Sequence, residues 1–169
     1  MKAMREMNNE RGFSMMEMMI VVVMIGLMAS LAAPSWLEQM PRLEAKAQVR
    51  EVVSKLREAR SLAIARKEAV GVSFDGINNI WEVFLDNGPA DNVHSAGDSV
   101  MSTGQIGLRV TMSYNSFANA DVIFSPDGTA AQSGVICLAA EGGSITYTID
   151  VLASTGRVKM VEGYFPLGL

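Results

Sequence analysis

The chain has 169 residues, enough for about one domain, and its 49% apolar and 19% charged residues exclude a disordered chain. Its net charge of -4 argues against a general nucleic-acid binder, because such domains carry a basic surface. The single cysteine, Cys137, excludes an intramolecular disulfide, and the single histidine, His94, excludes metal motifs that need two histidines. We therefore expect a single-domain protein that is not an enzyme, and we predict no cofactor and no metal site.

Charge and apolar residues divide the chain into four segments. A leader, residues 1–12, has a net charge of +1, and the apolar segment that follows, residues 13–37, carries one charge, Glu17. Residues 38–68 have a net charge of +3, whereas residues 69–169 have a net charge of -7 and hold most of the glycines. The four segments are interpreted as a charged N-terminal stretch, an apolar helix of membrane-spanning length, an amphipathic half-helix and a β domain.

Residues 13–68 are predicted to form one long helix. Its first half includes a run of 20 uncharged residues, Met18 to Leu37. A helix of that length spans roughly 30 Å, the thickness of the hydrocarbon core of a bilayer. In its second half apolar residues recur at helical spacing, which predicts a buried stripe made of Val49, Val52, Val53, Leu56, Ala59 and Ala63. Pro34 and Pro41 are expected to bend or locally open the helix, and Gly71 is expected to end it.

After the helix the apolar period changes to two, which is typical of strands. Residues 86–104 have the composition of a loop, and turn sequences separate the other segments. Seven strands are predicted, at residues 70–74, 80–85, 107–114, 121–124, 135–139, 145–151 and 157–161. The expected fold is therefore α+β, with a long N-terminal helix packed on an antiparallel β sheet or sandwich.

Three interpretations compete for the first 37 residues. A secretory signal peptide fits the basic start and a small-residue cleavage site at Ser30-Leu31-Ala32, but Glu17 would then lie inside the apolar region. A plain membrane anchor also leaves Glu17 unexplained, because a carboxylate in an apolar membrane helix costs roughly 2.5–3.5 kcal/mol. The third interpretation gives this carboxylate a function.

The stretch Arg11-Gly12-Phe13-Ser14-Met15-Met16-Glu17, followed by an apolar run, resembles the N-terminal signal of type IV pilins and pseudopilins. The resemblance implies that a prepilin peptidase cleaves between Gly12 and Phe13 and that the new N-terminal Phe13 is methylated. It also implies assembly through Glu17, which would meet the N-terminal amine of a neighbouring subunit. A buried carboxylate is tolerated when a cation pairs with it, so this charge favours association.

Two motifs in the last third of the chain narrow the resemblance. Phe124-Ser125-Pro126-Asp127-Gly128 and the later Thr155-Gly156-Arg157 are similar to turns of the GspH/FimT group of pseudopilins. The resemblance implies a minor pseudopilin of the type II secretion pseudopilus, which works with the prepilin peptidase and other pseudopilins or pilins. It further implies a single-pass protein of the inner membrane, with a cytoplasmic N-terminus and a periplasmic β domain.

The alternative is a FimT-like type IV minor pilin that takes part in pilus assembly or DNA uptake. Arg157 and Lys159 are the candidate residues for a weak DNA contact, because alternation places both on one face of a strand. Nucleic acid is nevertheless not the expected partner, because DNA affinity depends on neutralising phosphates and the β domain is acidic.

Other polar and aromatic residues are given structural interpretations. Asp86, Asp91 and Asp98 lie in an oxygen-rich loop that is expected to be solvated, with calcium binding as the alternative, and His94 in the same loop is expected to be exposed. Cys137 is interpreted as a buried small residue, with an intermolecular disulfide as the alternative. Core positions are expected for Phe74, Trp81 and Phe84, and an interfacial position for Trp36.

Overall fold

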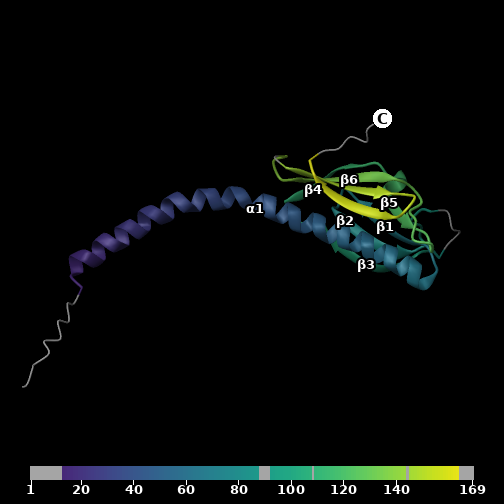
Figure 1. Cartoon of the computed structure of the whole chain (residues 1–169), viewed down its shortest axis with the longest axis horizontal. Coiled ribbons are helices and arrows are strands. Elements are labelled where there is room, and N and C mark those ends of the chain that lie inside the picture. Colours follow the sequence, from purple (N-terminus) through teal and green to yellow (C-terminus); the bar gives the residue numbers. More distant parts are fainter. Residues whose placement is uncertain (1–12, 88–91, 108, 144, 164–169) are drawn as a thin grey trace, which may run out of the picture. The chain divides into compact units, whose positions relative to one another are not determined.

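The structure, a computed structural model, describes residues 13–87, 92–107, 109–143 and 145–163, and it leaves the side chains of residues 32–39 undescribed. Contacts divide the chain into two units, Met1–Glu38 and Gln39–Leu169. A single helix, α1 (Met15–Arg66), begins in the first unit and ends in the second (Figure 1). The predicted leader, residues 1–12, lies outside the described residues.

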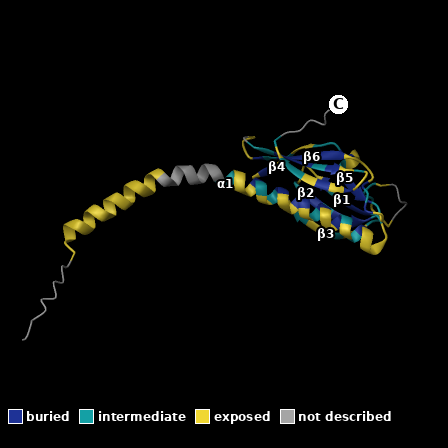
Figure 2. Cartoon of the chain, in the orientation of Figure 1, coloured by how far each residue is buried: buried dark blue, intermediate teal, exposed yellow. Residues whose placement is uncertain are grey.

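The second half of α1 packs on the strands through one face. All six residues of the predicted stripe are buried, as is Ala45 one turn before it: Ala45, Val49, Val52, Val53, Leu56, Ala59 and Ala63. Figure 2 shows the alternation of buried and exposed residues along this part of α1. The backbone stays helical through Pro34 and Pro41, so neither proline opens the helix.

The prediction that Gly71 ends the helix is wrong. The helix ends at Arg66, and the next residue, Lys67, has a positive φ of 59°, the left-handed conformation that commonly follows a helix. Gly71 lies in the first strand instead. A Cβ at this position would overlap the ring of Phe84, so glycine is needed here for close packing.

The described residues contain eight strands, which form two antiparallel sheets. Sheet A has the order β3-β2-β1-β5, with bounds Ser99–Gln105, Ile80–Leu85, Val70–Asp75 and Asp121–Phe124. Sheet B has the order β4-β6-β7-β8, with bounds Val110–Asn115, Gly134–Ala140, Thr146–Leu152 and Arg157–Glu162. A short 3-10 helix, η1 (Ala118–Ala120), precedes β5. These findings confirm the predicted α+β class.

One core joins α1 to both sheets. It contains the inward residues of α1, alternate residues of β1 and β2 such as Phe74 and Trp81, and alternate residues of β6 and β7 such as Leu138 and Tyr147. Phe84 is also fully buried, but on the opposite face of β2. All three aromatic residues predicted for the core are therefore buried.

Strand β3 corrects the sequence-based prediction, which placed a loop over residues 86–104. Its sequence, SVMSTGQ, is small and polar, and most of its residues are partly or fully exposed. Pairing with β2 and close packing hold it in place, because a Cβ at Gly104 would overlap the ring of Trp81. An exposed edge strand of this kind has little apolar alternation for a sequence pattern to reveal.

Candidate functional site

The predicted processing site lies at the start of the described chain. Gly12 is outside the described residues, whereas Phe13 is 77% exposed just before α1. Glu17 is exposed in the first turn of α1, where its N–H and that of Met18 donate to the carbonyl of Ser14. The carboxylate of Glu17 forms no ion pair with any described residue of this chain. It is accessible to a partner molecule.

The first half of α1 carries an apolar surface on all sides. Every residue from Phe13 to Leu31 is exposed, including all the large apolar ones (Figure 2). Residues 32–37 of the predicted membrane segment, with Trp36, have side chains outside the description. Across the described residues, no helix is both long enough and apolar enough to cross a membrane.

Two turns of the β domain carry the motifs that resemble the GspH/FimT group, one at residues 124–128 and the other at residues 155–157. These two signature turns meet each other beside α1. Gly128 and Gly156 both have positive φ angles, 83° and 59°. A Cβ at Gly156 would overlap the carbonyl oxygen of Gly128. The same oxygen accepts a hydrogen bond of 2.8 Å from Nε of Arg60. The two turns therefore form a junction that ties sheet A, sheet B and the helix together.

Asp127 fixes the first of these turns. Its Oδ1 accepts hydrogen bonds from Oγ1 of Thr129 at 2.6 Å and from the N–H of Thr129 at 2.9 Å. The Thr129 side chain first, and then its backbone N–H, hold the pKa of the Asp127 carboxyl below its ordinary value of 3.8. The charged Asp127 carboxylate thus stabilises the turn, in which the carbonyl oxygen of Gly128 accepts the hydrogen bond from Arg60.

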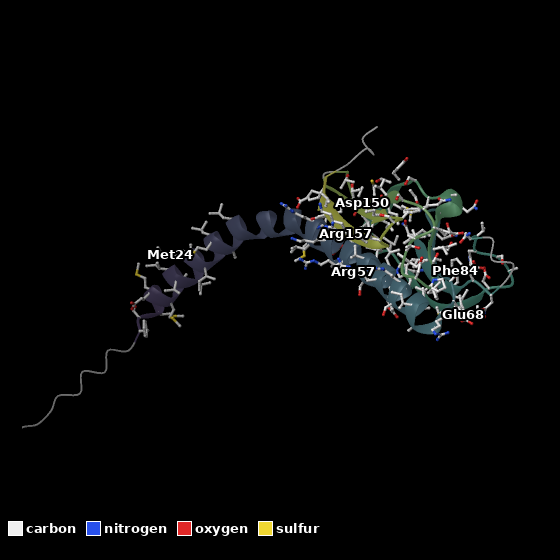
Figure 3. All side chains as sticks on the ribbon, turned by 45° about the vertical axis from the view of Figure 1, so that its right-hand side comes forward. Met24, Arg57, Glu68, Phe84, Asp150 and Arg157 are labelled. Carbon is white, nitrogen blue, oxygen red and sulfur yellow. The ribbon has the colours of Figure 1, made fainter. Side chains whose placement is uncertain are left out.

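The structure places both candidate DNA-contacting residues on one face of β8. Arg157 and Lys159 are exposed, whereas Val158 between them is buried. Asp150 on β7 stands directly opposite Lys159, so an acidic residue shares the face with the basic pair. Figure 3 labels Asp150 and Arg157 together on this part of the domain.

Sequence reasoning missed the basic residues that α1 contributes beside β8. Nη2 of Arg57 donates to the carbonyl of Val158 at 3.3 Å, which brings α1 next to Arg157 (Figure 3). Arg50 and Arg57 line a groove of about 280 Å³ together with Val53, Ser54 and Met160. Their positions two turns apart on the helix were visible in the sequence, but their proximity to a strand 100 residues later was not.

The loop after β2 is organised by its own side chains. Asp98 accepts hydrogen bonds from the N–H groups of Asn87 and Ser95, and Asp91 lies outside the description. The described residues contain no group of three or more histidine, cysteine, aspartate or glutamate side chains that could hold a metal ion. His94 is half-buried rather than exposed, since its ring packs 4.5 Å from that of Phe84.

Cys137 on β6 has no exposed surface. Its Sγ lies 3.6 Å from Oγ1 of Thr148 on the neighbouring strand. A thiol enclosed in this way cannot reach a second chain while sheet B is intact, so the buried interpretation agrees with the structure and the intermolecular disulfide does not.

A long helix whose first half is exposed and apolar, and whose second half packs on antiparallel sheets, defines a pilin-like protein. Solved structures support this class. The minor pseudopilin EpsH of the type 2 secretion system of Vibrio cholerae matches with a TM-score of 0.56 and 12% identity, over 70% of this chain and 97% of that one. The type IV minor pilin FimU of Pseudomonas aeruginosa matches with a TM-score of 0.56 and 16% identity, over 71% and 90%.

Family models identify the chain more closely. The model of type II transport protein GspH matches residues 48–156, and the prokaryotic N-terminal methylation motif matches residues 7–33. The chain belongs to the GspH family, as its two motifs predicted. Members are pilin-like proteins that anchor through the N-terminal helix and assemble into filaments, and the family is not one of known enzymes. None of the curated protein sequences matches the chain.

Proposed function

We propose that the chain is a minor pseudopilin, a structural subunit of the filament of a type II secretion system. The observation that carries this proposal is the GspH match over residues 48–156, which includes α1 from residue 48 onward and the glycines of both turns, Gly128 and Gly156. The filament extends into the periplasm and drives protein secretion. The chain contributes surface and geometry to it rather than chemistry.

Maturation begins with cleavage between Gly12 and Phe13 by the prepilin peptidase, followed by methylation of Phe13. The N-terminal methylation motif over residues 7–33 supports both steps. Cleavage creates a positively charged amine at Phe13, and the exposed Glu17 carboxylate pairs with the amine of an adjacent subunit. The pair lies among apolar helices, where a low dielectric strengthens it.

The apolar half of α1 holds the precursor in the inner membrane before assembly. The N-terminus is cytoplasmic and the β domain is periplasmic. Exposed apolar side chains from Phe13 to Leu31 support this placement, because so large an apolar surface requires lipid or other helices around it.

The second candidate is a type IV minor pilin. FimU matches the fold with the same TM-score as EpsH, so the likeness of fold favours neither system. A role in DNA uptake would use Arg157 and Lys159, and it would have to overcome the net charge of -7 on residues 69–169.

Intact-mass analysis of the membrane-extracted protein tests the maturation. We expect a chain of residues 13–169 with one added methyl group, and an uncut precursor when Gly12 is replaced by a bulky residue. A mature chain that begins near Ala32 would show an ordinary signal peptide instead.

Deletion of the gene in its own host separates the two filament systems. We expect loss of protein secretion into the medium, with pili and DNA uptake unchanged. The opposite pattern would establish the minor-pilin function.

A further inference from the structure

Strand β8 leaves a regular edge at one side of sheet B. It pairs with β7 through six consecutive residue pairs without a register shift. The other long outer strands are irregular, because the ladder of β4 with β6 shifts near Met112 and that of β3 with β2 shifts near Val83. Bulges of this kind protect an edge from pairing with another chain. The β8 edge has no such bulge.

The backbone groups at this edge can be assigned from two hydrogen bonds. The N–H of Gly163 donates to Thr146 at 2.8 Å, so odd-numbered residues of β8 direct their backbone groups toward β7. Val158 instead accepts the bond from Arg57 on the other side. By alternation the N–H and C=O groups of Met160 and Glu162 also point away from β7. No hydrogen bond joins them to another of the described residues, so an added strand can pair with them.

Basic side chains border the edge on both faces. On the inner side, the groove contains Arg50 and Arg57 above an apolar floor of Val53 and Met160. On the outer side lie Arg157 and Lys159. Among the described residues, none of these four cations has a carboxylate within 4.0 Å. Two carboxylates also lie here, since Asp150 stands opposite Lys159 and Glu162 is paired with Arg42. The cations outnumber them on each face, so a strand added beside β8 would face a net positive charge through both sets of its alternating side chains.

We propose that the β8 edge binds an extended, acidic segment of a neighbouring pilin-like subunit as an additional strand. Its backbone pairs with Met160 and Glu162, while its carboxylates meet Arg50 and Arg57 in the groove and the Arg157–Lys159 pair outside. The identity of the partner as a filament subunit rests on the function proposed above. A peptide fits better than a nucleic acid, because the edge offers backbone acceptors as well as donors and the groove contains the apolar Val53 and Met160, whereas phosphates would use the donors and cations alone.

A peptide titration with the full chain in non-ionic detergent tests the proposal. The probe is an acidic peptide of about eight residues, the length of a strand, in which pairs of glutamates alternate with pairs of threonines, so that carboxylates project from both faces. We expect saturable binding that weakens between about 0.05 and 0.15 M salt. The same peptide with alternate backbone nitrogens methylated keeps its charge but loses one edge of hydrogen-bonding groups, and it should not bind. Equal binding of both peptides would overturn the proposal in favour of unspecific charge attraction.

Variants locate the site. Replacing both arginines of the groove (Arg50→Gln with Arg57→Gln) should weaken peptide binding about tenfold, as expected from losing two charge-assisted contacts. The matched control removes two exposed charges from the end of α1 (Arg66→Gln with Lys67→Gln) and should leave binding unchanged. Similar losses in both variants would place the peptide elsewhere and refute the assignment.

Duplex DNA and vesicles of anionic phospholipid are the competing ligands. Binding of either through Arg50 and Arg57, with no binding of the acidic peptide, would overturn the proposal and assign the surface to phosphates. If the unmodified chain does not bind the peptide but still assembles through Glu17, the docking site is refuted and the filament function is not. Peptide binding without any assembly would instead refute the filament function.

Discussion

Replacement of Gly156 by alanine perturbs the junction between the two signature turns. The new Cβ would overlap the backbone carbonyl of Gly128 and would lie 2.8 Å from Nε of Arg60. Neither contact relaxes easily, because the carbonyl belongs to a turn fixed by Asp127 and is itself bonded to Arg60. The turn, the helix or both must move.

The magnitude follows from two separable contributions. A left-handed backbone conformation costs a residue with a Cβ about 1–2 kcal/mol, and overpacking a tight site adds about 1–3 kcal/mol. The sum is about 2–5 kcal/mol. A domain of this size loses about 4 °C in Tm for each kcal/mol, so the Gly156→Ala variant should unfold about 8–20 °C below the unmodified chain.

Gly142 offers a matched control. Its φ is 84°, in the same region as that of Gly156, but a Cβ there would meet no atom within 4 Å. The Gly142→Ala variant should therefore show the conformational cost alone, about 4–8 °C in Tm. Thermal unfolding of a fragment from Gln39 onward, followed by circular dichroism, compares the two. Equal losses in the two variants would refute a tight junction between the turns.

Three other outcomes are expected. Glu17→Ala should leave cleavage intact but reduce crosslinking to partner pilins, because the carboxylate that pairs with the neighbouring amine is gone; unchanged crosslinking would exclude this contact. A fragment that starts at Pro41 should be soluble and folded, since it keeps the buried stripe of α1, and aggregation in size-exclusion chromatography would contradict this packing. The Asp127→Ala variant should have a lower free energy of unfolding at pH 7, and this free energy should fall less as the pH is lowered. Because the pKa of Asp127 is lowered in the folded chain, the carboxylate contributes its full stabilisation above the ordinary value of 3.8, and this stabilisation is lost as the pH falls below that value. An unaltered acid unfolding curve would argue against the Asp127–Thr129 contact.

Sequence patterns predicted strands best where apolar alternation is bounded by turn residues. Strands 80–85 and 121–124 were predicted residue for residue, and the helical stripe from Val49 to Ala63 is buried throughout. The edge strand β3 was missed because its pairing with β2, rather than its own apolarity, holds it in the sheet. Gly71 was misread as a helix stop, since a glycine needed beside a ring looks the same in sequence as one needed for a turn.

The signature turns and the basic groove illustrate a second limit. The sequence predicted Gly128 and Gly156 as separate turns, but their mutual contact and the bond to Arg60 depend on how the two sheets close on α1. Arg50 and Arg57 likewise belong to the amphipathic half of the helix, where the sequence shows their charge but not their neighbours. Only the packing of α1 beside β8 turns them into the lining of a groove.

The enclosure of Cys137 gives this chain a built-in chemical reporter. It is the single thiol of the chain and has no exposed surface, so a thiol reagent reacts only when sheet B opens. Oγ1 of Thr148, next to the sulfur, also bonds to Gly163 at the end of β8. Labelling rates would therefore follow any event that displaces β8, and they would time the opening and closing of this strand without any substitution in the chain.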